Sequence, residues 1–194
     1  MYKISVRDAK QQLRTQYKLR RSRLKKSFRQ QCSQKITATI LQSKWYQESR
    51  QIFIYVSMKD EVDTHSLIDR ALADGKQVAV PYCIAESGEM NFYIIHSRKD
   101  LHEGYFGVYE PSPEMCERAE NKQGLIIIPA LAFDCHGYRM GYGKGYYDRY
   151  LSDFDGMKIG IGYSDCLRRC MIHDRFDKNV DGIITEKFIK FVAK

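Results

Sequence analysis

The sequence predicts an α/β fold: a three-layer structure in which an open, mostly parallel sheet carries helices on both faces. Short apolar runs of strand type alternate with stretches of helical period, and this alternation is typical of parallel strands joined by helices. The composition, 43% hydrophobic and 29% charged in 194 residues, is that of a globular protein with a core. No internal repeat or long linker divides the chain, so we expect one domain spanning residues 1–194.

The order of the elements follows from local signals. Ser5 and Asp8 give a capping-box-like start to a first amphipathic helix, with a break expected near Ser22. The later predicted helices cover residues 30–47, 64–74 and 146–154, and the predicted strands cover residues 51–57, 77–82, 91–95, 124–129, 158–163 and 182–185. Residues 103–120 form the one long irregular segment, which is either functional or a plain surface excursion.

The positive charge is concentrated near the N-terminus. Residues 7–29 contain ten lysine or arginine side chains and one aspartate, a local charge of +9 in a chain of net charge +8. We therefore expect an anionic partner near this helix, with residues 20–26 forming an ordinary solvated basic face. A nucleic-acid-binding module is the alternative from another functional class, and the nearly neutral remainder of the chain argues against it.

Other features limit the environment of the protein. The longest apolar run, residues 125–133, is too short to span a membrane, and the N-terminus lacks the apolar region of a signal peptide. The six cysteines include no C-x-x-C pair and are expected to be free thiols. We expect a cytoplasmic monomer that binds small molecules and neither nucleic acid nor a membrane.

A glycine-rich stretch at residues 137–148 lies between a predicted buried strand and a predicted helix, which is the layout of a phosphate-binding loop. Its glycines let backbone N–H groups converge on an anion without Cβ atoms in the way, and its basic side chains add full charges. These residues are Arg139, Gly141, Gly143, Lys144 and Gly145. The spacing is neither that of a Walker A loop nor that of a dinucleotide fingerprint, and a tight turn is the alternative.

Charged residues elsewhere are candidates for the same site. Asp148, in the first turn of the following helix, could hold Mg²⁺ on nucleotide phosphates or merely offset the helix dipole. Asp181, before the last predicted strand, is a second metal candidate. Lys10 and Arg14 lie on one face of the first helix and could reach a bound phosphate. Glu61 follows the first predicted strand, where it could accept hydrogen bonds from a substrate amine or amide, or provide a charge at the next helix N-terminus.

Six separated motifs resemble, in order, those of the 5-formyltetrahydrofolate cyclo-ligase family, also called 5,10-methenyltetrahydrofolate synthetase. They are Lys10-x-x-x-Arg14, Ser57-Met-x-Asp-Glu61, Gly107-x-x-Glu-Pro111, Pro129-x-x-x-Phe-Asp134, Gly137-x-Arg-x-Gly-x-Gly-Lys-Gly-Tyr-Tyr-Asp-x-Tyr150 and Asp181-x-x-x-Thr-Glu186. The resemblance extends over nearly the whole chain, and the segment ending Gly-Lys-Gly-Tyr-Tyr-Asp is its most specific part.

The resemblance implies an ATP- and Mg²⁺-dependent ring closure of 5-formyltetrahydrofolate to 5,10-methenyltetrahydrofolate, with release of ADP and phosphate. The formyl oxygen is a poor leaving group, so the γ-phosphoryl group would be transferred to it before N10 attacks the carbon. Such transfer needs positioning and charge neutralisation rather than a covalent nucleophile. A related ATP-using enzyme with another acceptor is the alternative.

The family pattern also implies roles for individual residues. ATP would be bound by Lys10, Arg14, Arg139, Gly141, Gly143, Lys144, Gly145 and Tyr146, with Arg139 and Lys144 acting in catalysis. Mg²⁺ would be held by Asp148 and Asp181. The folate pocket would be lined by Val56, Glu61, Phe106 and Tyr147. His173 and Asp174 are adjacent and resemble a catalytic pair. Phosphoryl transfer does not require such a pair, so we expect a structural turn there.

Overall fold

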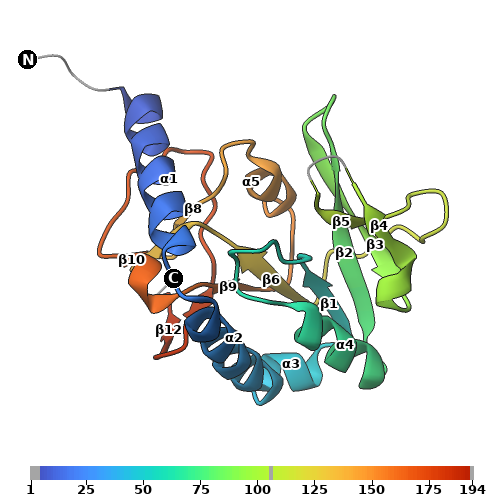
Figure 1. Cartoon of the computed structure of the whole chain (residues 1–194). Coiled ribbons are helices and arrows are strands. Elements are labelled where there is room, and N and C mark those ends of the chain that lie inside the picture. The colour runs from blue at the N-terminus through green and yellow to red at the C-terminus, as the bar shows by residue number, and fades with distance from the viewer. Residues whose placement is uncertain (1–4, 105–106, 193–194) are drawn as a thin grey trace, which may run out of the picture.

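A seven-stranded sheet with helices on both faces forms the centre of the molecule (Figure 1). The computed structural model describes residues 5–104 and 107–192. The strand order is β12-β11-β9-β6-β1-β2-β3, and the pairs from β11 through β2 are all parallel. Only the edge strands β12 and β3 pair antiparallel with their neighbours within the described sheet. The predicted α/β class with a mostly parallel sheet is therefore confirmed.

The elements have the following bounds. The helices are α1 (Val6–Ser22), α2 (Lys26–Leu41), α3 (Lys44–Glu48), α4 (His65–Ala73) and α5 (Tyr146–Tyr150), with short 3-10 turns η1 (Arg98–Asp100) and η2 (Ser164–Cys166). The strands of the large sheet are β1 (Gln51–Ile54), β2 (Gln77–Ile84), β3 (Glu89–Ile95), β6 (Leu125–Pro129), β9 (Met157–Ile161), β11 (Gly182–Ile184) and β12 (Ile189–Phe191). Two small sheets pair β4 (Leu101–Glu103) with β5 (Tyr109–Pro111), and β10 (Leu167–Arg168) with β7 (Ala132–Asp134) and β8 (Arg139–Met140).

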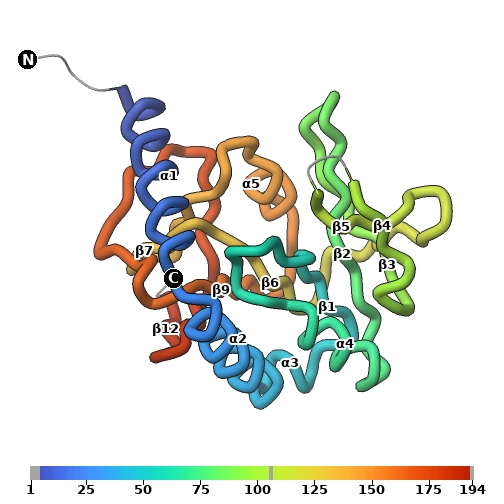
Figure 2. The backbone as a smooth tube through the Cα atoms, viewed as in Figure 1, coloured from blue at the N-terminus to red at the C-terminus, as the bar shows by residue number. Residues whose placement is uncertain are grey.

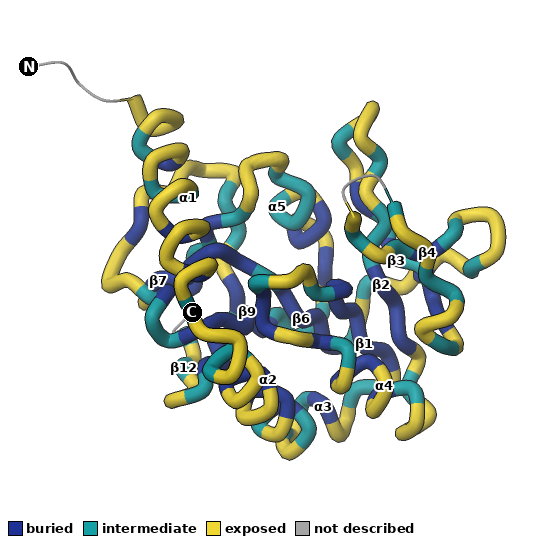
Figure 3. The backbone as a smooth tube through the Cα atoms, in the orientation of Figure 1, coloured by how far each residue is buried: buried dark blue, intermediate teal, exposed yellow. Residues whose placement is uncertain are grey.

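The core lies on both faces of the sheet because successive strand residues point to opposite sides. Ile52 and Ile54 of β1 belong to the apolar cluster that includes residues of α2, α3 and α4. Phe53, between them, belongs to the cluster on the other face, where its ring meets that of Phe154 edge-on at 5.1 Å. Figure 3 shows the central strands as the most deeply buried part of the trace. This two-sided burial explains why the strand sequences are continuously apolar rather than alternating.

The helical region before β1 differs from the prediction of one helix over residues 30–47. The break near Ser22 is confirmed, but α2 begins at Lys26 and ends at Leu41. A separate helix, α3, then starts because the Ser43 hydroxyl caps it by accepting from the Tyr46 N–H. The serine supplies a new N-terminus where the hydrophobic pattern alone indicates continuity.

The glycine-rich segment is also built differently from a simple strand, loop and helix. After β6 the chain first forms the β7–β8 hairpin of a small three-stranded sheet, and the loop that carries the glycines follows β8. The next helix, α5, ends at Tyr150, so the predicted helix over residues 146–154 is too long. A helix of this length adds little dipole to the loop, which makes side-chain charges and backbone N–H groups the main attraction for an anion.

Residues 103–120 are less irregular than expected. Their first and middle parts form the β4–β5 pair. The later part is hydrogen-bonded to β3, with Ala119 N–H donating to the Phe92 carbonyl and Ile94 N–H donating to the Glu117 carbonyl. Residues 117–119 thus extend the sheet on the side of β3, whereas β4 and β5 form a separate pair.

Two expectations about the chain as a whole can be compared with the structure. All six cysteines are free thiols, as predicted. None of the described helices is long and apolar enough to cross a membrane.

Replacing Thr64 by valine is expected to lower the free energy of unfolding by about 2 kcal/mol. Thr64 is fully buried, its hydroxyl donates to the Tyr55 carbonyl at 2.7 Å, and it accepts from the Ser57 N–H at 3.1 Å. Valine would leave both backbone groups buried without this partner. Urea unfolding measures the loss.

The control is Thr39→Val on α2, where the hydroxyl donates only to the Lys35 carbonyl. It should change the free energy of unfolding by less than about 0.5 kcal/mol. Equal losses in the two variants would contradict the expectation.

Candidate active site

The glycine-rich loop between β8 and α5 exposes a lysine between two glycines with left-handed backbone. Gly143 has φ +103° and Gly145 has φ +72°, values that side chains disfavour. Lys144 between them is exposed, and its ammonium group makes no hydrogen bond or ion pair with the described residues. The loop therefore presents a free positive charge together with accessible backbone.

Arg14 brings a second cation to this loop from α1. The trace in Figure 2 has α1 beside the C-terminal half of the chain. Arg14 Nε donates to the Gly141 carbonyl at 3.1 Å. A Cβ atom at Gly143 would lie 3.1 Å from Arg14 Cζ, so the guanidinium is packed against that glycine. Two predicted phosphate contacts, Arg14 and the loop, are thus adjacent.

Lys10 has a different neighbourhood from the one its spacing indicates. Its ammonium nitrogen lies 2.8 Å from Asp174 Oδ2 and 2.5 Å from Asp177 Oδ2. Burial lowers its pKa, but the two carboxylates outweigh that effect and the pKa is raised, so Lys10 stays charged. It fastens α1 to the segment before β11, one turn of helix away from Arg14. His173, in that segment, stacks on the Tyr138 ring at 3.7 Å between centroids, and the turn of this segment lies just after it, at residues 175–176.

Arg139 lies on β8 with its side chain only 5% exposed. One guanidinium nitrogen donates to Asp148 Oδ1 at 2.7 Å, and the carbon of the group lies 5.4 Å from the centre of the Tyr147 ring. The Arg139 Nε and the Tyr147 hydroxyl are buried and have no hydrogen-bond partner among the described residues. Leaving a buried polar atom unpaired is costly, so each of these two atoms is a candidate contact for a polar ligand.

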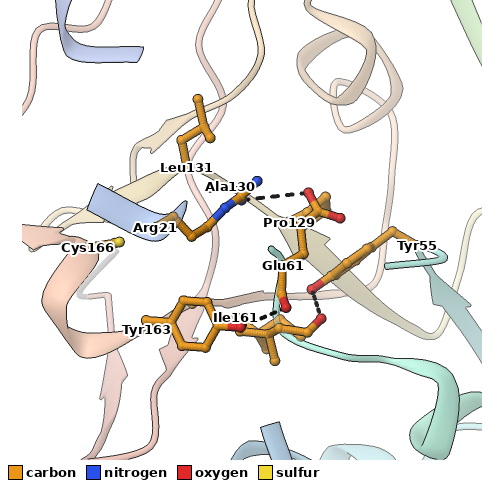
Figure 4. Close-up of a pocket in the computed structure, with 11 residues that line it drawn as sticks. Arg21, Tyr55, Glu61, Pro129, Ala130, Leu131, Ile161, Tyr163 and Cys166 are labelled. Atoms are coloured by element: carbon orange, nitrogen blue, oxygen red, sulfur yellow. Dashed lines mark hydrogen bonds and ion pairs between the residues drawn. The ribbon is translucent and has the colours of Figure 1, made fainter. Parts of the chain in front are cut away.

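Glu61 is buried at the carboxyl end of β1 and is held by three groups. Its Oε2 accepts from the Met58 N–H at 3.0 Å, and its Oε1 accepts from the Tyr142 hydroxyl at 2.8 Å. Arg21, from the end of α1, lies 3.8 Å from Oε1 (Figure 4) and also donates to the Tyr142 hydroxyl. Burial raises the pKa of Glu61, while the Met58 N–H, Arg21 and Tyr142 act in the opposite direction. The glycine-rich loop, α1 and the β1 end meet at this carboxylate.

Arg21 corrects one expectation and is a site residue that the sequence reasoning missed. Residues 20–26 were expected to be a solvated basic face, yet Arg21 is 7% exposed, whereas Arg20, Arg23, Lys25 and Lys26 are exposed as predicted. A signal was available: Arg21 is four residues after Tyr17 and three before Leu24, which places it on the apolar stripe of the helix.

The other predicted substrate residues have mixed surroundings. Val56 is buried in the cluster on the α2 side of the sheet. Tyr146 packs against the cluster on the opposite face and has the Arg149 guanidinium over its ring. Tyr147 is the partner of Arg139. Phe106 lies outside the described residues.

The predicted metal ligands are at separate places. Both hydrogen bonds of the Asp148 carboxylate within the described residues use Oδ1, from Arg139 and from the Lys178 N–H, which leaves Oδ2 for a cation. Asp181 Oδ2 accepts from the Lys158 N–H at 2.9 Å, near the start of β9. Asp181 is therefore at the amino edge of the parallel sheet, whereas Glu61 is at the carboxyl edge.

One further group has metal-ligand chemistry. The ligand atoms of Asp134, His136 and Cys170 lie within 4.8 Å of one another, the one such trio that the described part of the chain contains. The Asp134 carboxylate, however, accepts from three backbone N–H groups, those of His136, Tyr138 and Met171. Those hydrogen bonds stabilise the β7–β8 turn, so the Asp134 carboxylate has a structural role.

Two cavities differ in size and position. The one beside Glu61 has a volume of about 10 Å³, room for at most one water molecule, and is lined by Arg21, Tyr55 and Tyr163 among others (Figure 4). The larger, about 540 Å³, opens at the amino edge of the sheet between residues such as Trp45, Gln51 and Gln77. None of the predicted site residues lines the larger one. Glu61 and Arg21 therefore lie where the structure is closed, whereas Lys144 is exposed.

Comparison with known proteins gives one consistent family. The model of the 5-formyltetrahydrofolate cyclo-ligase family matches residues 6–186. The 5-formyltetrahydrofolate cyclo-ligase of Mus musculus is 33% identical over 96% of this chain and 98% of its own. Among solved structures, the 5,10-methenyltetrahydrofolate synthetase of Aquifex aeolicus is 32% identical with a TM-score of 0.84, covering 95% of this chain and 93% of that one. The synthetase of Mycoplasma pneumoniae is 25% identical with a TM-score of 0.70, covering 91% and 98%.

Proposed function

This chain belongs to the 5-formyltetrahydrofolate cyclo-ligase family and is a ligase, and we propose that it uses Mg²⁺ and ATP to convert 5-formyltetrahydrofolate to 5,10-methenyltetrahydrofolate. The main support for ATP binding is the loop at Lys144, where an unpaired lysine, two glycines with positive φ and Arg14 lie together. These groups suit the phosphates of a nucleotide. ADP and phosphate are the other products of the proposed reaction.

The proposed chemistry activates the formyl oxygen. Transfer of the γ-phosphoryl group forms an O–P bond at that oxygen as the bond to ADP breaks. N10 then attacks the formyl carbon, its proton passes to the departing phosphate, and the C–O bond breaks, which leaves the methenyl bridge. Lys144 and Arg139 would neutralise charge on the transferred group, and Arg14 would hold the phosphates on the loop.

The folate would be recognised at Glu61. Its carboxylate can accept hydrogen bonds from the amine and amide N–H groups of a pterin ring, with Val56, Phe106 and Tyr147 as the proposed apolar surroundings. Burial strengthens such bonds because water does not compete. The carboxyl edge of a parallel sheet is also where ligands bind in open α/β folds.

Mg²⁺ would be held by Asp148, whereas Asp181, the other predicted ligand, lies at the amino edge of the sheet and would not share that ion. Magnesium usually takes one or two carboxylates and completes its shell with phosphate oxygens and water, so Asp148 Oδ2 alone satisfies the requirement. When bound, the ion supplies positive charge to the nucleotide phosphates. Arg139, which donates to the other carboxylate oxygen of Asp148, fixes the orientation of this side chain.

Replacing Asp148 by asparagine is expected to raise the Mg²⁺ concentration needed for half-maximal activity by at least about tenfold. The substitution keeps the shape and removes the charge that a hard cation prefers. Activity is measured across a Mg²⁺ titration at saturating ATP. Asp153→Asn, which removes an exposed carboxylate paired with Lys122, is the control and should leave the titration unchanged. A lower rate with an unaltered Mg²⁺ requirement would assign Asp148 to positioning Arg139 instead.

The proposed function is tested by near-ultraviolet absorbance. Purified protein, Mg²⁺, ATP and 5-formyltetrahydrofolate are mixed, and absorbance of the conjugated methenyl product is followed. An increase that requires ATP is the expected result. ATP binding without any effect of the folate would favour a related ATP-using enzyme with another acceptor, and salt-sensitive binding to nucleic acid without ATP binding would favour a nucleic-acid-binding module.

A further inference from the structure

The Glu61 carboxylate is closed to any substrate in this structure. Its side chain is 5% exposed, and the adjoining cavity of about 10 Å³ has no room for an organic ring. Oε2 is bonded to the backbone of Met58 and Oε1 to the Tyr142 hydroxyl. A substrate N–H can reach this carboxylate only after one of the present neighbours leaves.

Tyr142 is the neighbour best able to leave. Arg21 is buried near the end of the 17-residue helix α1, and the Met58 bond comes from the backbone. Tyr142 is 39% exposed and stands between Gly141 and Gly143, whose backbone can change direction at low cost. Its phenol donates to Oε1 as an N–H group of a substrate would.

The same loop segment is tied to Arg14. Arg14 Nε donates to the Gly141 carbonyl, and the guanidinium also packs against Gly143. Arg14 thus restrains the backbone on both sides of Tyr142. An anion on the loop would compete for the guanidinium, because a charge-assisted bond to phosphate is stronger than a bond to a neutral carbonyl. Loss of the bond from Arg14 to the Gly141 carbonyl would let the backbone around Tyr142 move.

Arg21 would stay behind when Tyr142 leaves. Its guanidinium, 3.8 Å from Glu61 Oε1, is then the remaining positive charge beside a buried carboxylate. A buried carboxylate without a counter-charge is strongly disfavoured, so Arg21 keeps Glu61 ionised and ready to accept hydrogen bonds.

We propose that Tyr142 is a positioning residue that covers Glu61 in the absence of nucleotide, and that phosphates bound at the loop release it so that the folate can bind. This inference rests on the proposed function. It assigns to one tyrosine the coupling between the two substrate sites. Because coupling between binding sites is reciprocal, nucleotide must tighten folate binding by the same factor as folate tightens nucleotide binding.

The test measures the dissociation constant of 5-formyltetrahydrofolate by calorimetry, with and without the non-hydrolysable analogue adenylyl imidodiphosphate and Mg²⁺. In the wild-type protein, the analogue is expected to tighten folate binding by about tenfold. Tyr142→Phe keeps the ring and removes the hydroxyl that donates to Glu61 and accepts from Arg21. That variant should bind folate without nucleotide about tenfold more tightly than the wild-type protein does, and the analogue should add little. Tyr93→Phe, at a phenol on β3 remote from Glu61, is the control and should behave as wild type.

The outcomes separate this inference from the proposed function. Unchanged or weaker nucleotide-free folate binding by Tyr142→Phe would overturn the gating role while leaving the proposed function standing. Absence of folate binding by the wild-type protein, with the analogue or without it, would overturn both. Arg21→Gln provides a second readout: with its counter-charge removed, Glu61 should lose folate binding at a higher pH than in the wild-type protein. The exposed control Arg23→Gln should not shift that pH.

Discussion

Replacing Lys144 by alanine is expected to lower kcat/KM by at least about 100-fold. Lys144 is the cation of the glycine-rich loop that no described residue neutralises, so its charge is available to the transferred phosphoryl group. Removing one charged group that is positioned to stabilise the transition state usually costs about this much. The ATP-dependent formation of the methenyl product provides the rate.

The same substitution should leave the fold intact. Lys144 is exposed and makes no ion pair with the described residues, so the free energy of unfolding should change by less than about 0.5 kcal/mol. Lys35→Ala, at an exposed lysine on α2, removes an equal charge away from the site and should keep full activity. Normal turnover by the Lys144 variant would show that its ammonium does not act on the phosphates.

Replacing Glu61 by glutamine is expected to raise the KM for 5-formyltetrahydrofolate by about 10- to 100-fold and the KM for ATP by less than about twofold. The substitution preserves shape but turns a charged acceptor into a neutral one, and hydrogen bonds to charged groups are worth about 1.5–3 kcal/mol. Steady-state kinetics with each substrate varied in turn measures both values. An equal rise in the two KM values would argue against a pterin contact at Glu61.

The pH dependence of the same reaction gives an independent check on Glu61. Burial raises the pKa of this carboxyl above its ordinary value of 4.5, so it takes up a proton at a higher pH than an exposed glutamate. As the pH falls through that raised pKa, the acceptor is lost and kcat/KM for the folate should fall. Glutamine at position 61 should remove this limb of the profile. A limb that persists in the variant would belong to another group.

The sequence was most informative where many successive residues obey one rule. β1 and β6 are almost entirely apolar because both faces of the sheet are covered, whereas β9 includes Lys158. The positions of all three strands were predicted to within a few residues. β7, β8 and β10 were not predicted. They are two or three residues long, too short to show a period. β7 and β8 form a local hairpin, and β10 pairs with β7 from a distant part of the chain.

The candidate site was predictable to the extent that it lies in contiguous motifs. The spacing around Lys144 indicates an anion-binding loop, and Arg14 does reach it. The surroundings of Lys10 were not predictable, because its partners Asp174 and Asp177 are about 165 positions away in sequence. Arg21 was obscured by its basic neighbours: a run of charges gives no local indication that one of them is paired with a buried glutamate.

The exposed basic side chains around the end of α1 affect how ligands approach the site. Four basic side chains around the end of α1 and the start of α2 contact solvent, whereas Arg14 and Arg21 of α1 reach the loop and Glu61. The exposed four are Arg20, Arg23, Lys25 and Lys26. Nucleotides and folates are both anions, and a field of one sign raises their local concentration and orients their approach before any contact forms. These side chains would thus raise the association rate, and this effect would weaken as ionic strength increases. The dissociation rate would depend on the buried groups.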